Sequence, residues 1–199
     1  ELHRRAGKAA RRAAAFPLAF ARFEAGIALL PSDAWRSHYD LALDLHAGAA
    51  QAAYLSSEWA ALDERVADVK SHGRTTMDQL PAWEAQIDAL VGRHEYLAAV
   101  DVGMQALELL GVHLPRDPQQ EDIVAVAVST LTALQRIGAE GLEALPDVDD
   151  PVVAAAIRIQ VRVSPAAYFG KPTLLPVIAA NLVNTSIERG LSVGTPYAL

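Results

Sequence analysis

Cysteine is absent from the 199 residues of this sequence. Its absence excludes disulfide scaffolds, zinc sites built from thiolates and cysteine nucleophiles. It also fits the reducing cytoplasm, which is the location that we expect. Basic residues are outnumbered as well, with 17 Lys and Arg against 24 Asp and Glu. The resulting net charge of −7 disfavours nucleic acid as a partner.

Long hydrophobic runs are also missing. The longest extends only from Ile123 to Val128, whereas a helix that spans a bilayer needs about 20 apolar residues. No basic segment followed by an apolar stretch opens the chain, as a secretory leader would. We therefore expect no membrane insertion. The chain starts at Glu1 without an initiator Met and ends soon after a helical pattern, so we expect a segment of a larger protein.

Hydrophobic residues nevertheless make up 52% of the chain, enough to bury a core. They recur with helical periodicity, and Pro and Gly fall between the periodic stretches. Thr76-x-x-Gln79 has the form of a capping box, although Pro81 would then lie in the first turns of that helix. Short connections predict antiparallel hairpins. The expected helices cover residues 2–14, 17–30, 33–50, 59–69, a stretch from about 76, 95–110, stretches from 117 and from 151, and 172–189.

The start of the chain is its one basic stretch. We interpret it as the solvated face of a helix, with an arm that binds phosphate or a membrane as the alternative. The basic residues are Arg4, Arg5, Lys8, Arg11 and Arg12.

An internal repeat is the most informative feature. In two stretches that are 37 residues apart, an aromatic residue is followed by apolar or small residues three, seven and ten positions later. The two sets are Trp59, Leu62, Val66 and Val69, and Tyr96, Ala99, Gly103 and Ala106. The same spacing occurs near the start in Phe16, Ala19, Phe23 and Gly26, and near the end, without the aromatic, in Pro172, Leu175, Ala179 and Leu182.

This spacing predicts the packing of a helical hairpin. The +3, +7 and +10 positions lie on one face of the second helix, where small residues let a neighbouring helix approach closely. One hairpin cannot bury both of its apolar faces, so several should stack. We therefore predict an all-α fold, a right-handed superhelix of stacked antiparallel helical hairpins with about ten helices, as a single domain over residues 1–199. An ordinary helical bundle is the alternative.

The stretch from Tyr96 through Ala99 and Ala106-Leu107 to Pro115 resembles the second helix of a tetratricopeptide repeat, with Gly103 where that family usually has a large aromatic residue. A wider resemblance rests on two stretches. They are Ala19-x-x-x-Phe23-x-x-Gly26-x-x-Leu29-Leu30 followed by Trp35-x-x-x-Tyr39, and Ala98-Ala99-x-x-x-Gly103-x-x-Ala106-Leu107-x-Leu109-Leu110-Gly111-Val112-x-Leu114-Pro115.

Both stretches resemble the helical region that follows the ATPase module in large bacterial signalling proteins. Those proteins fuse a serine/threonine kinase-like domain, a nucleotide-binding ATPase and often a sensor histidine kinase. The resemblance implies a helical repeat linker or sensor that couples neighbouring modules. It carries over no activity, because this chain has neither a Gly-x-x-x-x-Gly-Lys-Ser/Thr loop nor a kinase catalytic loop.

No other motif predicts chemistry. Gly190-Leu191-Ser192-Val193-Gly194 fits the nucleophile-elbow pattern, but that mechanism needs a preceding strand, and here a helix precedes the Ser. The six histidines are scattered without a third ligand for any pair. The aspartates at 147, 149 and 150 lack the spacing of a calcium loop and are better suited to cap a helix. We therefore expect no catalytic, cofactor or metal site.

Three functions remain open at this stage. The first is a non-catalytic interaction module that contacts neighbouring domains of a parent protein or a signalling partner through a groove lined by first helices. The second is a sensing domain whose groove holds a small ligand or peptide against Trp35, Tyr39 and Trp83, although core packing is the more common role of such residues. The third is a hydrolase that uses Ser192.

Overall fold

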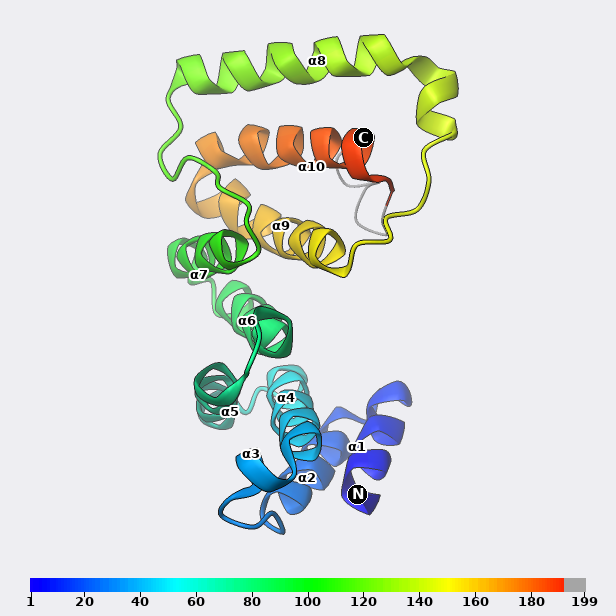
Figure 1. The fold of residues 1–199 in the computed structure, drawn as a ribbon. Coiled ribbons are helices and arrows are strands. Elements are labelled where there is room, and N and C mark those ends of the chain that lie inside the picture. The colour runs from blue at the N-terminus through cyan, green and yellow to red at the C-terminus, as the bar shows by residue number, and fades with distance from the viewer. Residues whose placement is uncertain (192–199) are drawn as a thin grey trace. The chain divides into compact units, whose positions relative to one another are not determined.

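The computed structural model describes residues 1–191, and these are almost entirely helical (Figure 1). The predicted all-α class is confirmed for this part of the chain, where the only extended pairing is an isolated bridge between Asp147 and Leu191. The helices are α1 (Leu2–Arg12), α2 (Phe16–Ile27), α3 (Ala34–Ser37), α4 (Tyr39–Leu55), α5 (Trp59–His72), α6 (Thr76–Gly92), α7 (Tyr96–Leu109), α8 (Gln120–Glu143), α9 (Pro151–Gly170), the 3-10 helix η1 (Pro172–Leu174) and α10 (Leu175–Arg189).

The chain divides into two compact units, residues 1–89 and 90–199, with the boundary inside α6. In the first unit α2 packs between α1 and α4, and α4 packs on α5. A core of small apolar residues then joins α4, α5 and α6. That core consists of Ala47, Ala50, Ala53, Leu62, Val66, Val69, Ala82, Ala85 and Ala89.

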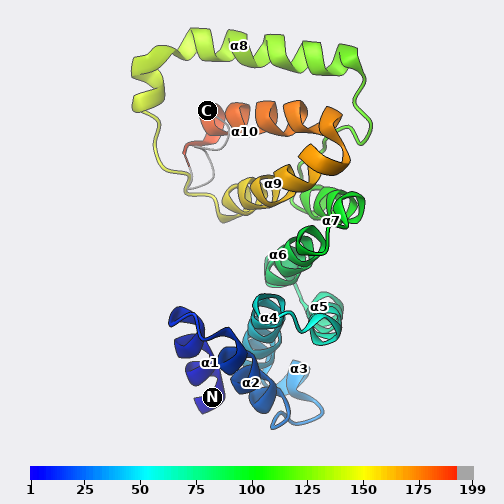
Figure 2. The same ribbon diagram turned by 180° about the vertical axis from the view of Figure 1, so that it is seen from behind.

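In the second unit α9 packs on α7, and α10 packs on both α9 and α8. The chain order is not the packing order, because α8 precedes α9 in the sequence but lies along α10 (Figure 2). One hydrogen bond joins these two helices, from the Asn184 side-chain nitrogen to Thr130 Oγ1 at 3.0 Å.

The +3, +7 and +10 positions of the sequence repeat are buried in all three complete copies. In α2, α5 and α7 the residues at +3, +7 and +10 belong to the buried set of each helix. The closest approach is at Gly103, where a Cβ atom would lie only 1.9 Å from Val163 Cγ2 of α9. The glycine is therefore required by the contact between α7 and α9.

The turn before each of these helices has one conformation. Ala14, Ser57 and His94 have φ angles of 55°, 60° and 61°, and each stands two residues before the leading aromatic. The next residue donates its backbone N–H across the turn at 2.9 Å, as in Ala15 to Ala10, Glu58 to Ala53 and Glu95 to Leu90. Such bonds satisfy carbonyl groups at a helix end. The repeat in the sequence thus corresponds to a repeated backbone turn.

The expected helix over residues 33–50 is broken in two. His38 has φ −138° and ψ 46°, which separates the four-residue α3 from α4. The capping box expected at Thr76 and Gln79 is displaced by one residue and lies at Thr75 and Asp78. The Thr75 backbone N–H donates to Asp78 Oδ2 at 3.0 Å, and the Asp78 backbone N–H donates to Thr75 Oγ1 at 3.1 Å. Pro81 lies inside α6. The predicted start at residue 117 is also early, because α8 begins at Gln120.

The last turns of α8 correct another expectation. Gly138, Gly141 and Pro146 in the sequence suggest an exposed connection around Glu140 and Glu143; both residues are exposed, but they lie in helix beyond a kink at Gly138, which has φ 66°.

The longest unbroken apolar run also underestimates how hydrophobic this helix is as a whole. Among the described residues, α8 is the one helix whose length and composition would allow it to cross a membrane. Helices of soluble proteins also pass this test.

Substitution of Gly103 tests the contact between α7 and α9. We expect Gly103→Ala to lower the free energy of unfolding by about 1–3 kcal/mol, because overpacking against Val163 outweighs the better helix propensity of Ala. Urea unfolding measures the change, and the exposed Gln105→Ala on the same helix should stay within about 0.5 kcal/mol. Adding Val163→Ala should recover part of the loss, and strictly additive effects would contradict the contact.

The repeated turn gives a second test. A non-glycine residue in the left-handed region is strained, so Ser57→Gly should raise the free energy of unfolding by up to about 1 kcal/mol. Ser71→Gly, near the end of α5, should instead lower it, because glycine weakens a helix. Equal effects of the two substitutions in urea unfolding would show that residue 57 is not left-handed.

Candidate functional site

The first unit contains a cavity of about 190 Å³ whose lining comes largely from α1 and α4, with one residue each from α2 and α6. Two of these helices, α1 and α4, are each followed in the chain by a helix that packs against them, α2 and α5. The lining consists of Lys8, Arg11, Phe23, Asp44, Ala47, Gly48, Gln51 and Pro81. It therefore combines an apolar floor with charged and amide side chains.

The floor depends on two glycines. The Phe23 ring is fully buried, and a Cβ atom built at Gly7 or at Gly48 would lie 2.7 Å from it. Gly7 belongs to α1 and Gly48 to α4, so the ring of α2 fills the space between these two helices. Larger side chains at either position would push the helices apart and change the shape of the cavity.

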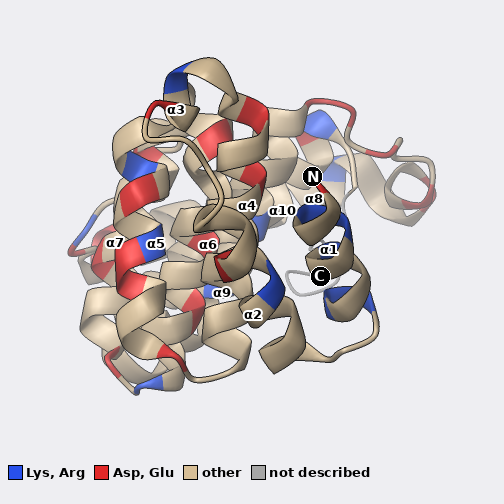
Figure 3. Ribbon diagram, turned by 90° about the horizontal axis from the view of Figure 1, so that it is seen from below, with Lys and Arg blue, Asp and Glu red and all other residues tan. Residues whose placement is uncertain are grey.

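The polar lining residues are paired across the two helices. Lys8 Nζ lies 2.6 Å from Asp44 Oδ2, and Arg4 Nη1 lies 2.9 Å from the same oxygen. Arg11 donates a hydrogen bond to the Gln51 side chain. The basic residues follow the length of α1, as the blue segments of Figure 3 show. The basic stretch that the sequence presented as a solvated face is thus partly engaged with α4.

The aromatic residues that we predicted for the groove lie elsewhere. The ring of Trp35 is stacked on His72 at a centroid distance of 4.6 Å, and it also contacts His46. The Tyr39 hydroxyl donates to Asp78 at 2.7 Å and accepts from the backbone N–H of Arg74 at 2.8 Å. Both side chains join α3 and α4 to the α5–α6 turn. Their role in ligand binding stays a prediction.

Trp83 is buried, and Lys70 Nζ lies 3.0 Å from the centroid of its ring. None of the three predicted groove aromatics lines the cavity described above. The cavity residues on α1 and α4 were missed because they are ordinary surface types in the sequence. A signal was present in the i, i+4, i+7 spacing of Arg4, Lys8 and Arg11, which places them on one helix face.

The residues that we assigned to repeat packing lie where helices meet. Trp59 packs against the core that joins α4, α5 and α6 and lies 6.5 Å from Tyr54, between ring centroids. Tyr96 is stacked on Phe169 of α9 at 5.1 Å. The others are buried, namely Phe23, Leu62, Val66, Ala99, Gly103 and Ala106.

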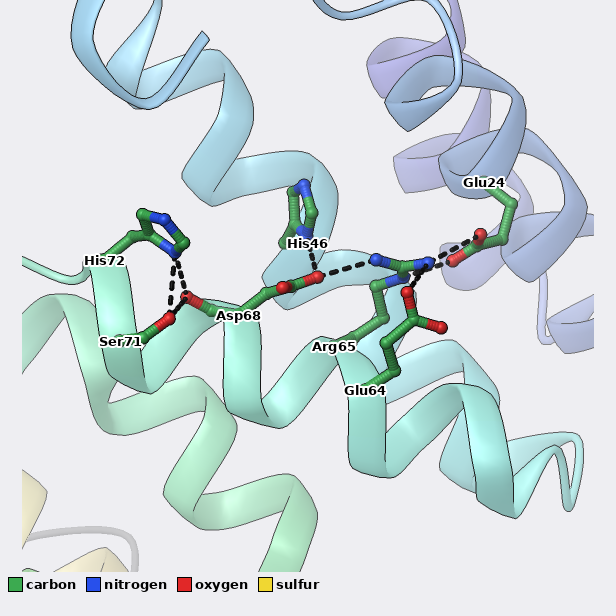
Figure 4. Close-up of polar contacts among 7 residues, drawn as sticks. All are labelled: Glu24, His46, Glu64, Arg65, Asp68, Ser71 and His72. Atoms are coloured by element: carbon green, nitrogen blue, oxygen red, sulfur yellow. Dashed lines mark hydrogen bonds and ion pairs between the residues drawn. The ribbon is translucent and has the colours of Figure 1, made fainter. Parts of the chain in front are cut away.

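A polar network joins α2, α4 and α5 (Figure 4). Arg65 is its centre, with ion pairs to Glu24 at 2.9 Å, to Glu64 at 3.0 Å and to Asp68 at 2.6 Å. The second partner of the Asp68 carboxylate is His46 Nδ1 at 3.0 Å. Glu64 and Asp68 lie on α5 with Arg65, so the pair with Glu24 is the one that joins Arg65 to another helix, and removing Arg65 would leave the partly buried Glu24 carboxylate without this partner.

This network has no catalytic geometry, although it contains Ser, His and Asp. The hydroxyl of Ser71 and the ring of His72 contact the backbone carbonyl of Asp68, at 3.1 and 2.9 Å, and not its carboxylate. His46 is buried, and burial lowers its pKa. The negative charge of Asp68 raises the pKa, but its effect is smaller than that of burial. The side chain is therefore neutral at neutral pH and acts as a packed core histidine.

Metal ligation finds no support among residues 1–191, which contain no group of three or more His, Asp or Glu side chains able to hold an ion. Of the three aspartates before α9, Asp150 has a structural role. Asp150 Oδ1 accepts backbone hydrogen bonds from Val152 at 2.8 Å and from Val153 at 3.3 Å, as expected for a helix cap. Ser192 lies outside the described residues.

The second unit has a cavity of about 290 Å³ between α9 and α10. Its lining is mainly apolar and consists of Val161, Ser164, Pro165, Tyr168, Leu175, Ala179 and Leu182. Leu175, Ala179 and Leu182 are the +3, +7 and +10 positions of the last repeat copy. The helix face that carries these positions is buried in α2, α5 and α7, whereas in α10 the same face lines part of a cavity.

No protein-family model, no curated protein and no solved structure matches this chain.

The buried His46 predicts a dependence of stability on pH. Its lowered pKa means that the unfolded chain binds a proton more readily, so the free energy of unfolding should fall as pH decreases from 7 to 5.5. One proton limits the fall to about 1.4 kcal/mol per pH unit. His46→Gln should show a smaller decrease in urea unfolding at the two pH values, and His38→Gln, an exposed control, should behave as the parent chain. Equal slopes for all three chains would contradict this assignment.

Proposed function

We propose that the chain is a non-catalytic protein–protein interaction module that binds a peptide segment in the cavity between α1, α4 and α6. The observation that carries the proposal is the lining of that cavity, in which first helices of successive hairpins present charged and amide groups above an apolar floor. Grooves of stacked helical hairpins commonly serve as binding surfaces.

We further propose that the hairpins stack as a right-handed, tetratricopeptide-like superhelix. Two observations support this finer architecture. The turn of Ala14, Ser57 and His94 recurs with the same hydrogen bonds. In the first unit, α4 contributes to one core together with its own partner helix α5 and with the next first helix, α6.

The polar groups of the cavity can exchange partners at low cost. Lys8 and Asp44 remain more than one-third exposed, and such exposed ion pairs contribute only about 0–1 kcal/mol. A carboxylate of an incoming peptide can therefore replace Asp44 beside Lys8, and a peptide amide can replace Gln51 beside Arg11. An apolar side chain of the same peptide would then cover Phe23. We propose an acidic and apolar segment as the ligand.

The partner follows from the resemblance described for the sequence. We propose that the segment belongs to a neighbouring ATPase or kinase module of a bacterial signalling protein, or to a signalling partner. The helical chain would then couple such modules without chemistry of its own. This assignment rests on the resemblance, and the cavity provides the surface that it requires.

A second candidate function is the sensing of a small ligand. The apolar cavity between α9 and α10 favours it, because its lining of Val, Pro, Tyr, Leu and Ala suits a compact apolar molecule. A thermal-shift screen of small apolar compounds tests this candidate. Hits should be lost in Ala179→Phe, which fills the cavity, and an absence of hits would remove the candidate.

Selection of peptides from a random display library tests the interaction function. We expect enrichment of acidic and apolar sequences, and binding at least tenfold weaker in the variant Lys8→Gln/Arg11→Gln, because both cavity cations are lost. The matched control is Arg5→Gln/Arg12→Gln, which changes the net charge equally on exposed positions of the same helix. Fluorescence anisotropy with an enriched peptide measures the affinities.

Two outcomes would contradict the proposal. One is repeated selection without any enriched sequence. The other is equal weakening by the cavity variant and the control variant, which would indicate attraction by overall charge and not a site.

A further inference from the structure

Helix α8 packs against the second unit with one side and leaves its other side uncovered. Of its residues, all of which the structure describes, only Thr130 is buried, and α10 is the main helix against which α8 packs. Figures 1 and 2 show no other helix of the second unit on the side of α8 that faces away from α10. This outward side therefore lacks a partner in the described part of the chain.

The outward side of α8 carries large apolar side chains. Val124, Val128 and Leu131 are 51%, 59% and 58% exposed. Their spacing of four and three positions places them along one stripe of the helix, away from Thr130. A contiguous apolar stripe that stays exposed on a folded chain marks an interaction surface.

The charges of α8 favour a protein over a membrane as the partner of this stripe. Helices that lie on a membrane surface usually carry Lys and Arg on their polar face. In α8 the one basic residue is Arg136, whereas Glu121, Asp122, Glu140 and Glu143 are acidic. No charged residue lies between Asp122 and Arg136, so the charges flank the apolar stripe and do not interrupt it.

The stripe is complementary to a second copy of itself in the antiparallel direction. At about 100° per residue, Val124 and Leu131 lie about 40–60° to one side of Val128, and Glu121 and Arg136 lie about 20–80° to the other side. A two-fold axis through Val128, perpendicular to the helix, reverses the helix direction and keeps each side on its own side. Val124 then meets Leu131 of the other copy, and Glu121 meets Arg136 of the other copy.

The levels along the helix agree with this pairing. Val124 lies four residues before Val128 and Leu131 three residues after it, whereas Glu121 lies seven before and Arg136 eight after. Each pair is therefore level to within about 1.5 Å, the rise of one residue. Within residues 1–191, neither Glu121 nor Arg136 takes part in an ion pair. A parallel pair of helices would instead bring like charges together.

We propose that α8 is a dimerisation surface and that its occupant is α8 of a second copy, packed antiparallel about Val128. The two-fold axis gives two ion pairs between Glu121 and Arg136, one at each end of the apolar stripe. One helix pair is a small interface, so we expect a dissociation constant of about 1–100 µM. The dimer does not depend on the peptide cavity of the first unit, and it would join two copies of that cavity in one assembly.

Sedimentation equilibrium at chain concentrations of about 1–300 µM tests the proposal. We expect the mass to rise from that of one chain, 21.2 kDa, toward twice that value. Val128→Glu places two like charges at the axis and should raise the dissociation constant about tenfold or more. Val152→Glu makes the same change at an exposed valine of α9 and should leave the constant within about twofold. A chain that stays monomeric, or a dimer that both variants weaken equally, overturns the proposal.

Exchange of the two charges tests the antiparallel register. Glu121→Arg and Arg136→Glu each replace two attractive pairs by two repulsive ones, so each should raise the dissociation constant about fivefold or more. The double variant Glu121→Arg/Arg136→Glu restores the pairs and should return to within about twofold of the parent chain. A double variant that is as weak as the single ones overturns the proposal. So does a chain that stays monomeric and binds vesicles of phosphatidylcholine, which would place a membrane on this face.

Discussion

Close approach between neighbouring helices is the constraint on which this structure depends. The ring of Phe23 fits only because Gly7 and Gly48 have no side chains, and Val163 fits against α7 only because residue 103 is glycine. Between α4, α5 and α6, alanines have the same effect, because their small side chains let the helices approach closely. A chain with few aromatic residues thus builds its core from short side chains, and the helix backbones lie correspondingly near one another.

The cavity of the first unit is a consequence of this packing. Because the Phe23 ring lies between Gly7 of α1 and Gly48 of α4, the polar residues near these glycines meet through their long side chains. Lys8 and Asp44 join the two helices with a partly exposed ion pair. The packing that stabilises the first unit therefore leaves charged groups in the lining of the cavity, where we propose that they exchange partners.

The sequence predicted the features that depend on local pattern. Helix periodicity gave the all-α class, and the spacing after Trp59 and Tyr96 identified faces that are buried. It could not predict the break at His38, because no Pro or Gly marks it, and the conformation depends on Trp35 packing against His46 and His72. The cavity was missed for a similar reason. Arg11 and Gln51 are 40 residues apart in the sequence, and only packing brings them together.

The role of α1, α4 and α6 in peptide binding can be tested most directly by NMR of the chain with a bound peptide. If the account is right, changes in amide chemical shift will concentrate in α1, α4 and the first half of α6, with the largest near Lys8, Asp44 and Gln51. Changes that centre on the outer faces of α2 and α5, with these three residues unaffected, would contradict it.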